Sequence, residues 1–151
     1  MTATITTDAS YYSRHKVGAY AFWISTNLFR LCKAGPLKGD VCSSHEAEFK
    51  SIVNALHTLH QSNCKITHIY INTDSRTTIN AIQFSYDSLW CKDTLKAYKS
   101  IVALLNAKVT LRHIKAHIHT NTARNWVNDW CDQEAKKAAI KEIQKRNLVV
   151  S

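Results

Sequence analysis

Hydrophobic and polar residues alternate in the first part of the chain, which is typical of strands. Residues 3–8 interleave threonine with small or apolar residues, and residues 17–26 are rich in aromatic and β-branched types. Residues 28–33 continue as a third strand antiparallel to the second, and Gly35 and Pro36 mark its end or a bend. The chain therefore begins with three predicted strands, the first of which ends at Asp8.

The spacing of apolar residues changes to that of a helix after residue 43. Ser43 and Glu46 have the spacing of a capping box, and apolar residues then recur every three or four positions up to Leu59. Asn63 ends this helix. The later pattern predicts strands over 66–72 and 108–115, helices around 79–84 and over 89–106, a polar loop at 117–125 and a last helix over 125–147.

The predicted order of elements is β-β-β-α-β-α-α-β-α. Three sequential strands followed by α-β alternation predict an α/β fold with a five-stranded mixed sheet, antiparallel at first, and helices on both faces. The sequence has no internal repeat, linker or break in composition. We therefore expect residues 1–151 to form a single domain.

Composition narrows the class of protein. Apolar residues make up 45% of the 151 residues and charged residues 21%, with three Gly and one Pro, which excludes disordered and collagen-like chains. No apolar run approaches the ~20 residues that span a bilayer, and the first residues lack the pattern of a signal peptide. We expect a soluble, cytoplasmic protein with no membrane partner.

The charge balance points to a polyanionic partner. Lysine and arginine total 20 against 11 acidic residues, a net charge of +9, which favours nucleic acid, although the excess could also serve only solubility. The five cysteines form no C-x-x-C pair, so we expect reduced thiols rather than a zinc site on cysteine.

Four acidic residues lie where a purely structural role explains them poorly. Asp8 and Asp74 end predicted strands, and ligand sites in α/β sheets gather at such strand ends. Glu48 lies near the buried side of the first helix. Asp132 lines up with a stripe of small apolar residues on the last helix, which favours it over Asp129 as the acid that points inward.

Carboxylates that crowd together repel one another unless cations hold them. Two divalent ions with oxygen ligands would resolve this, and such a pair can cut a phosphodiester by activating a water and stabilising the leaving oxygen. Each acid also has a structural alternative: Asp8 in a turn, Asp74 as a helix cap, Glu48 on a helix surface, and Asp132 paired with Lys136. The four together favour a metal-dependent nuclease.

These residues resemble the motifs of type 1 ribonuclease H. The family has a strand Asp followed by a small residue and Ser, a Glu in the first helix, a T-D-S sequence after the fourth strand and an acid in N-x-x-x-D-x-x-A. The corresponding residues are Asp8-Ala9-Ser10, Glu48, Thr73-Asp74-Ser75, and Asp132 between Asn128 and Ala135. The likeness covers the chain from Thr7 to about Ala139.

The resemblance implies a ribonuclease H-like fold and a two-metal-ion endonuclease. Asp8, Glu48, Asp74 and Asp132 would bind two Mg²⁺ or Mn²⁺ ions and hydrolyse the RNA strand of RNA–DNA hybrids, leaving 5′-phosphate and 3′-hydroxyl ends. The family's loop histidine would be His117, with His119 as the alternative, and it would move a proton or help product release. We expect a monomer without an obligatory protein partner.

Candidate substrate contacts follow from the same resemblance and from one basic helix face. Ser10, Ser44, His45 and Arg76 lie at or near positions where the family contacts the hybrid. Lys92, Lys96 and Lys99 recur at helical spacing, either as a substrate contact or as a plain solvated face.

Several alternatives stay open at this stage. Another nuclease on the same fold, a junction resolvase or an exonuclease, would use the same acids, and a non-catalytic nucleic-acid-binding module would keep the basic surface. A zinc site on His113, His117 and His119 is a weaker alternative. Trp126 and Trp130, four residues apart, favour core packing over a platform for stacking bases.

Overall fold

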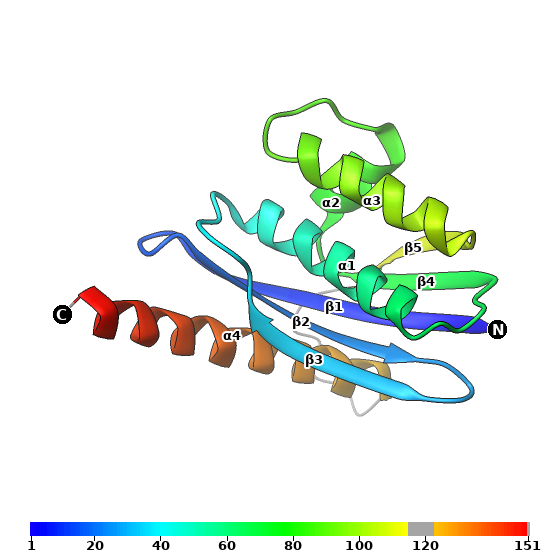
Figure 1. Ribbon diagram of the computed structural model, residues 1–151, viewed down its shortest axis with the longest axis horizontal. Coiled ribbons are helices and arrows are strands. Elements are labelled where there is room, and N and C mark those ends of the chain that lie inside the picture. The colour runs from blue at the N-terminus through cyan, green and yellow to red at the C-terminus, as the bar shows by residue number, and fades with distance from the viewer. Residues whose placement is uncertain (115–122, 151) are drawn as a thin grey trace.

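The computed structural model describes residues 1–114 and 123–150, the side chains of 123, 124 and 148–150 excepted. The predicted order of elements is confirmed (Figure 1). The elements are β1 (Thr2–Tyr12), β2 (Val17–Ser25), β3 (Arg30–Pro36), α1 (Ser44–Gln61), β4 (His68–Thr73), α2 (Arg76–Phe84), α3 (Lys92–Leu105), β5 (Lys108–His113) and α4 (Ala123–Val150).

The five strands form one mixed sheet in the order β3-β2-β1-β4-β5. β1, β2 and β3 pair antiparallel, whereas β4 pairs parallel with β1 on one side and with β5 on the other. The predicted mixed sheet, antiparallel first and then parallel, is confirmed.

Helices cover both faces of the sheet, as predicted (Figure 1). α1 lies over β1 and β2 and buries Phe49, Ile52 and Leu56 against the sheet, in one cluster with Ile5 and Phe22. α4 lies on the opposite face, where Ala135 and Ala139 are fully buried. Large apolar side chains therefore fill the layer between α1 and the sheet, whereas small ones let α4 lie close to the opposite face of the sheet.

β1 is longer than predicted. We expected it to end at Asp8, but it continues to Tyr12, because it keeps its pairing with β2 up to Tyr12 and Val17. Its pairing with β4 ends much earlier, at Thr6 and Asn72. The strand therefore runs on beyond its parallel neighbour.

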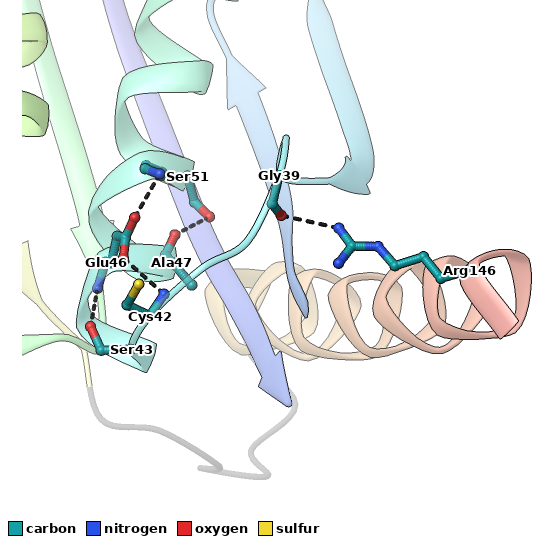
Figure 2. Close-up of polar contacts among 8 residues, drawn as sticks. Gly39, Cys42, Ser43, Glu46, Ala47, Ser51 and Arg146 are labelled. Atoms are coloured by element: carbon teal, nitrogen blue, oxygen red, sulfur yellow. Dashed lines mark hydrogen bonds and ion pairs between the residues drawn. The ribbon is translucent and has the colours of Figure 1, made fainter. Parts of the chain in front are cut away.

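The predicted capping box starts α1. Ser43 Oγ accepts a hydrogen bond from the Glu46 N–H at 3.1 Å, and Glu46 Oε2 accepts one from the Cys42 N–H at 2.9 Å (Figure 2). Two donors at the helix end are thereby satisfied, which fixes where α1 begins and where its later residues point.

α4 is tied to the connection between β3 and α1 near its C-terminal end. Arg146 Nη2 donates to the Gly39 carbonyl at 3.0 Å (Figure 2), and Nη1 lies 3.4 Å from Asp40 Oδ1. The helix starts at Ala123, two residues before the predicted start, and the predicted loop at 117–125 lies mostly outside the described residues. Among the described helices, none combines the length and apolarity needed to span a membrane.

Candidate active site

The early end of β4 leaves a notch in the sheet beside Asp8. On one side Asp8 pairs with Ala21 of β2, and on the other it lies beyond the last pair that joins β1 to β4. Asp74 directly follows Thr73, the last residue of β4. Two carboxylates from strands adjacent in the sheet therefore reach the same place, although Asp8 lies within its strand rather than at its end.

Glu48 reaches the notch from α1. One carboxylate oxygen from each of Asp8, Glu48 and Asp74 lies within 4.8 Å of the other two. Three of the four acids singled out in the sequence thus meet in space, from a strand, a helix and a strand end. Because the cap at Ser43 fixes where α1 begins, it also fixes where Glu48 lies along the helix and where its side chain reaches the notch.

The cluster lies in a partly buried site, in which Asp8 is buried and Glu48 and Asp74 are half-buried. Asp8 is 7% exposed, and its Oδ1 accepts a hydrogen bond from the Ala9 N–H at 2.9 Å. Glu48 Oε2 is buried and has no hydrogen-bond partner among the residues that the structure describes, and the same holds for Thr7 Oγ1. Buried acceptors of this kind are costly unless something positive or a donor reaches them.

Burial and mutual repulsion disfavour the charged forms. Burial, with the charge of Asp74 next in size and that of Asp132 smaller, raises the pKa of Asp8 from 3.8 to about 7. Burial, followed by the charges of Asp8 and Asp74, raises the pKa of Glu48 well above its usual 4.5. A cation between the three carboxylates would remove both causes, because it replaces lost hydration and offsets the repulsion.

The donor set fits a hard divalent cation. All the ligand atoms that the cluster offers are carboxylate oxygens. Mg²⁺ and Mn²⁺ prefer such oxygens, whereas zinc is typically bound by nitrogen and sulfur. The buried Glu48 Oε2, which has no hydrogen-bond partner among the described residues, is the oxygen that a bound cation would satisfy most directly.

Asp132 lies near the cluster but is not one of its three closest members. Its charge contributes to the raised pKa of Asp8, and it follows the buried Cys131 on the side of α4 that faces the sheet. Its Oδ2 also accepts from Lys136 Nζ at 3.1 Å, with 27% of the side chain exposed. Both sequence interpretations of Asp132, the inward acid and the ion pair, therefore describe part of its surroundings.

The structural alternatives for the other three acids are wrong. Asp8 lies inside β1 rather than in a turn. The cap of α2 is Ser75, whose Oγ accepts from the Thr78 N–H at 3.2 Å, and not Asp74. Glu48 is half-buried, with one carboxylate oxygen fully buried, rather than exposed on the surface of the helix.

The predicted substrate residues surround the notch on several elements. Ser10 is two residues beyond Asp8 in β1, and the exposed Ser44 and His45 open α1, one turn before Glu48. The His45 ring lies 5.9 Å from Trp90, between ring centroids. Arg76, exposed, opens α2 two residues after Asp74.

The three lysines lie farther out, on α3. Lys92, Lys96 and Lys99 are exposed and together line one surface cavity of about 650 Å³, beside Tyr86. The expected common face is therefore present. Their contact with a substrate stays a prediction.

Of the three histidines singled out in the sequence, His113 lies among the described residues. His117 and His119 lie outside the described residues. His113 is exposed at the end of β5, with Nε2 3.2 Å from the Asp74 carbonyl oxygen. It therefore borders the notch through the backbone of Asp74, and the zinc alternative has no support from it.

Sequence reasoning missed a polar bridge beneath the notch. Buried Asn72 accepts from Arg112 Nε at 2.8 Å and donates to Thr6 Oγ1 at 3.3 Å, which ties β1, β4 and β5 together. The Arg112 guanidinium also lies 4.5 Å from the centre of the Tyr70 ring. Partners 40 and 66 residues apart leave no local signal in a single sequence.

Solved structures with this fold include several ribonucleases H. LC11-RNase H1, isolated from compost by a metagenomic approach and solved in complex with an RNA/DNA hybrid, matches with a TM-score of 0.76 and 16% identity, over 93% of this chain and 99% of that one. RNase H1 of the halophilic archaeon Halobacterium salinarum matches with a TM-score of 0.72 and 10% identity, over 91% and 97%. The N-terminal RNase H domain of a Mycobacterium tuberculosis protein gives 0.71 and 11%, over 96% and 98%.

Identities this low show a shared fold alone. No curated protein matches the chain in sequence. The family model of RNase H, in contrast, matches residues 1–140 and so includes β1, α1, β4 and the stretch of α4 that carries Asp132. With this match over most of its length, the chain belongs to the RNase H family.

Proposed function

We propose that this protein is a metal-dependent endoribonuclease that hydrolyses the RNA strand of RNA–DNA hybrids. The observation that carries the proposal is the notch in which Asp8, Glu48 and Asp74 offer oxygens within 4.8 Å of one another, in a chain of the RNase H family. LC11-RNase H1, which shares the fold, has been solved with an RNA/DNA hybrid bound, and this supports the choice of substrate.

The residues that would hold two Mg²⁺ or Mn²⁺ ions are Asp8, Glu48 and Asp74, with Asp132 completing the set. Such ions, when bound, supply an activated water and stabilise the leaving oxygen of the phosphodiester, which leaves 5′-phosphate and 3′-hydroxyl ends. The chain itself contributes pre-arranged carboxylates: Asp8 is fixed by β1 and by the Ala9 N–H, and Glu48 by the capped helix. Asp132 would leave Lys136 as it turns toward the site.

The polar and basic groups around the notch would bind the substrate. Ser44 and His45, one helical turn from Glu48, would contact a strand whose scissile phosphate lies at the carboxylates. Ser10 and Arg76 flank the notch on β1 and α2. A hybrid is distinguished from other duplexes by 2′-hydroxyls on one strand only, which short polar side chains such as serine can read.

Two further contributions complete the proposal. Lys92, Lys96 and Lys99 on α3 would bind phosphates away from the cut and provide affinity without sequence preference. His117, or His119 in its place, would move a proton at the water or the leaving group, for which an imidazole is suited near neutral pH.

The direct test presents one sequence as RNA–DNA hybrid, duplex RNA, duplex DNA and single strands, each with Mg²⁺, Mn²⁺ or EDTA. We expect cleavage of the RNA in the hybrid alone, abolished by EDTA. Asp8→Asn should abolish it too, whereas Asp40→Asn, the same change at an exposed acid near Arg146, should not. Hybrid that stays intact with wild-type protein and both metals would contradict the proposal.

The assay also separates the remaining alternatives. Cleavage of duplex or branched DNA in place of hybrid would keep the carboxylate site and make the protein a resolvase or exonuclease on the same fold. Hybrid binding without any cleavage would make it a nucleic-acid-binding module.

A further inference from the structure

Three of the four tryptophans of the chain gather on the α4 side of the sheet. Trp23 of β2 meets Trp126 and Trp130 of α4 edge to face, with ring centroids 5.5 and 5.4 Å apart and interplanar angles of 89° and 81°. Trp130 is half-buried in this cluster, in line with the core packing expected for it. Trp126 is 58% exposed, so core packing does not account for its position.

Trp126 and Trp23 line a cavity of about 560 Å³ on this face. The polar residues Thr4, Ser25 and Asn72 and the basic Arg30 also line it. Among the described residues that line it, none is acidic. The cavity therefore combines flat aromatic surfaces, small polar groups and one positive charge.

Arg30 gives the cavity its charge preference. It is the first residue of β3, it is exposed, and it forms no ion pair with any residue that the structure describes. The protein as a whole carries a net charge of +9. A ligand that complements both features has a planar ring system for the indoles and a negative charge for the guanidinium.

The cavity lies on the same strands as the carboxylate notch. Thr4 lines it and Asp8 is four residues farther along β1, on the same face by the alternation of a strand, about 13 Å away. Asn72, at its other wall, is two residues before Asp74. The cavity and the notch are therefore neighbouring sites on the same two strands.

We propose that this tryptophan-lined cavity binds an unpaired nucleotide of a single-stranded nucleic acid, with its base against Trp126 and a phosphate near Arg30. Base pairs inside a duplex are already stacked on both faces, so an indole at the surface stacks on unpaired bases in preference to internal base pairs. Such a site gives the protein an affinity for single strands that needs neither metal nor hydrolysis and is independent of the function proposed above.

The test measures binding of a fluorescein-labelled twelve-nucleotide oligo(dT) in EDTA, by anisotropy and by quenching of tryptophan fluorescence. Trp126→Ala is expected to weaken binding about tenfold and to remove most of the quenching. Arg30→Ala should weaken it by a smaller factor and lower the slope of log affinity against log salt by about one. Trp126→Phe, which keeps an aromatic face, should restore part of the affinity.

Matched variants control for charge and for apolar surface. Arg14→Ala removes an exposed arginine between β1 and β2, at the opposite end of these strands, and Leu104→Ala removes an exposed apolar side chain of α3. Neither should change oligo(dT) binding. Cleavage of a blunt hybrid and the melting temperature of each variant check that the fold is intact.

Two results would overturn the inference. If the Trp126→Ala and Arg30→Ala variants both bind oligo(dT) like the wild type, the cavity holds no nucleotide, whether or not the hybrid is cleaved. If thymidine monophosphate competes for the site at the same concentration as unlabelled oligo(dT), the ligand is a free nucleotide and not a strand. Hybrid cleavage lost with oligo(dT) binding retained would instead count against the proposed function alone.

Discussion

Asp8 on β1 and Glu48 on α1 bring carboxylate oxygens within 4.8 Å of each other, although Asp8 is buried and Glu48 has one fully buried oxygen. Two buried groups of like charge at this distance destabilise the fold when both are ionised. Their arrangement is therefore best suited to a state in which a cation lies between them.

Removal of one of the two charges should stabilise the metal-free protein and inactivate it. Asp8→Asn and Glu48→Gln are each expected to raise the melting temperature in EDTA by a few degrees, because a neutral amide ends the repulsion. Each should lower hybrid cleavage in Mg²⁺ at least about a hundredfold, because a metal ligand is lost. Asp40→Asn, at an exposed acid, should leave both quantities near wild type.

Metal-free stability should fall as pH rises from about 4 to above 7. The pKa of Asp8 is about 7 in the folded protein against 3.8 ordinarily, so the folded state binds more protons than the unfolded state in this window. Glu48, also raised, adds to the effect in the same direction. Melting temperatures across pH in EDTA measure the slope, which Asp8→Asn should flatten; a slope of opposite sign would contradict the assignment.

Asp132 should matter more to metal binding than its neighbour on α4. Asp132→Asn is expected to raise the Mg²⁺ concentration that gives half-maximal cleavage about tenfold or more, because one carboxylate near Asp8 is lost. Asp129→Asn is the matched change and should have a smaller effect. Titration of cleavage rate with Mg²⁺ compares the two, and equal effects would show that the acids of α4 are wrongly assigned.

The lysines of α3 should contribute affinity rather than chemistry. Lys96→Ala with Lys99→Ala is expected to weaken hybrid binding and lower the salt slope by up to about two, with little change in the rate at saturating hybrid. Lys141→Ala with Lys145→Ala removes the same charge from exposed positions on α4. If both double variants change the slope equally, the effect is one of net charge and not of a contact.

α1 should depend on its buried apolar side. Leu56 is fully buried against the sheet, so Leu56→Ala is expected to cost about 2–5 kcal/mol of unfolding free energy. Leu104→Ala, at a position that is 66% exposed, should change it by less than about 0.5 kcal/mol. Urea denaturation measures both, and similar losses would mean that α1 does not pack as described.

Periodicity predicted the elements well where one face is buried. Residues 44–61 combine a cap, a regular apolar stripe and a stop, so the boundaries of α1 were predictable. The end of β1 was not. A strand that loses one neighbour and keeps the other has the same local pattern as a strand that keeps both, so only the register of Tyr12 and Val17 reveals its length.

The candidate site was predictable as a set of residue types and less so as a geometry. Asp8, Glu48 and Asp74 stood out because acids are costly near apolar faces and strand ends. Asp132 could not be placed from spacing alone, since on a helix it can turn toward either Asp8 or Lys136. The Asn72–Arg112 bridge and the tryptophan-lined cavity depend on long-range contacts that no local pattern contains.

The hydrogen bond from Arg146 to the Gly39 carbonyl influences where Asp132 lies, although Arg146 and Asp132 are far apart on α4. α4 is one continuous helix of 28 residues, about 42 Å long, so it moves as a stiff rod. A helix held only by its stripe of small apolar residues could rotate about that contact with the sheet. A second contact near its C-terminal end, from Arg146 to Gly39, prevents this rotation. The position of Asp132, the fourth acid proposed to hold metal, is thereby determined partly by the guanidinium of Arg146, fourteen residues downstream and about 20 Å away.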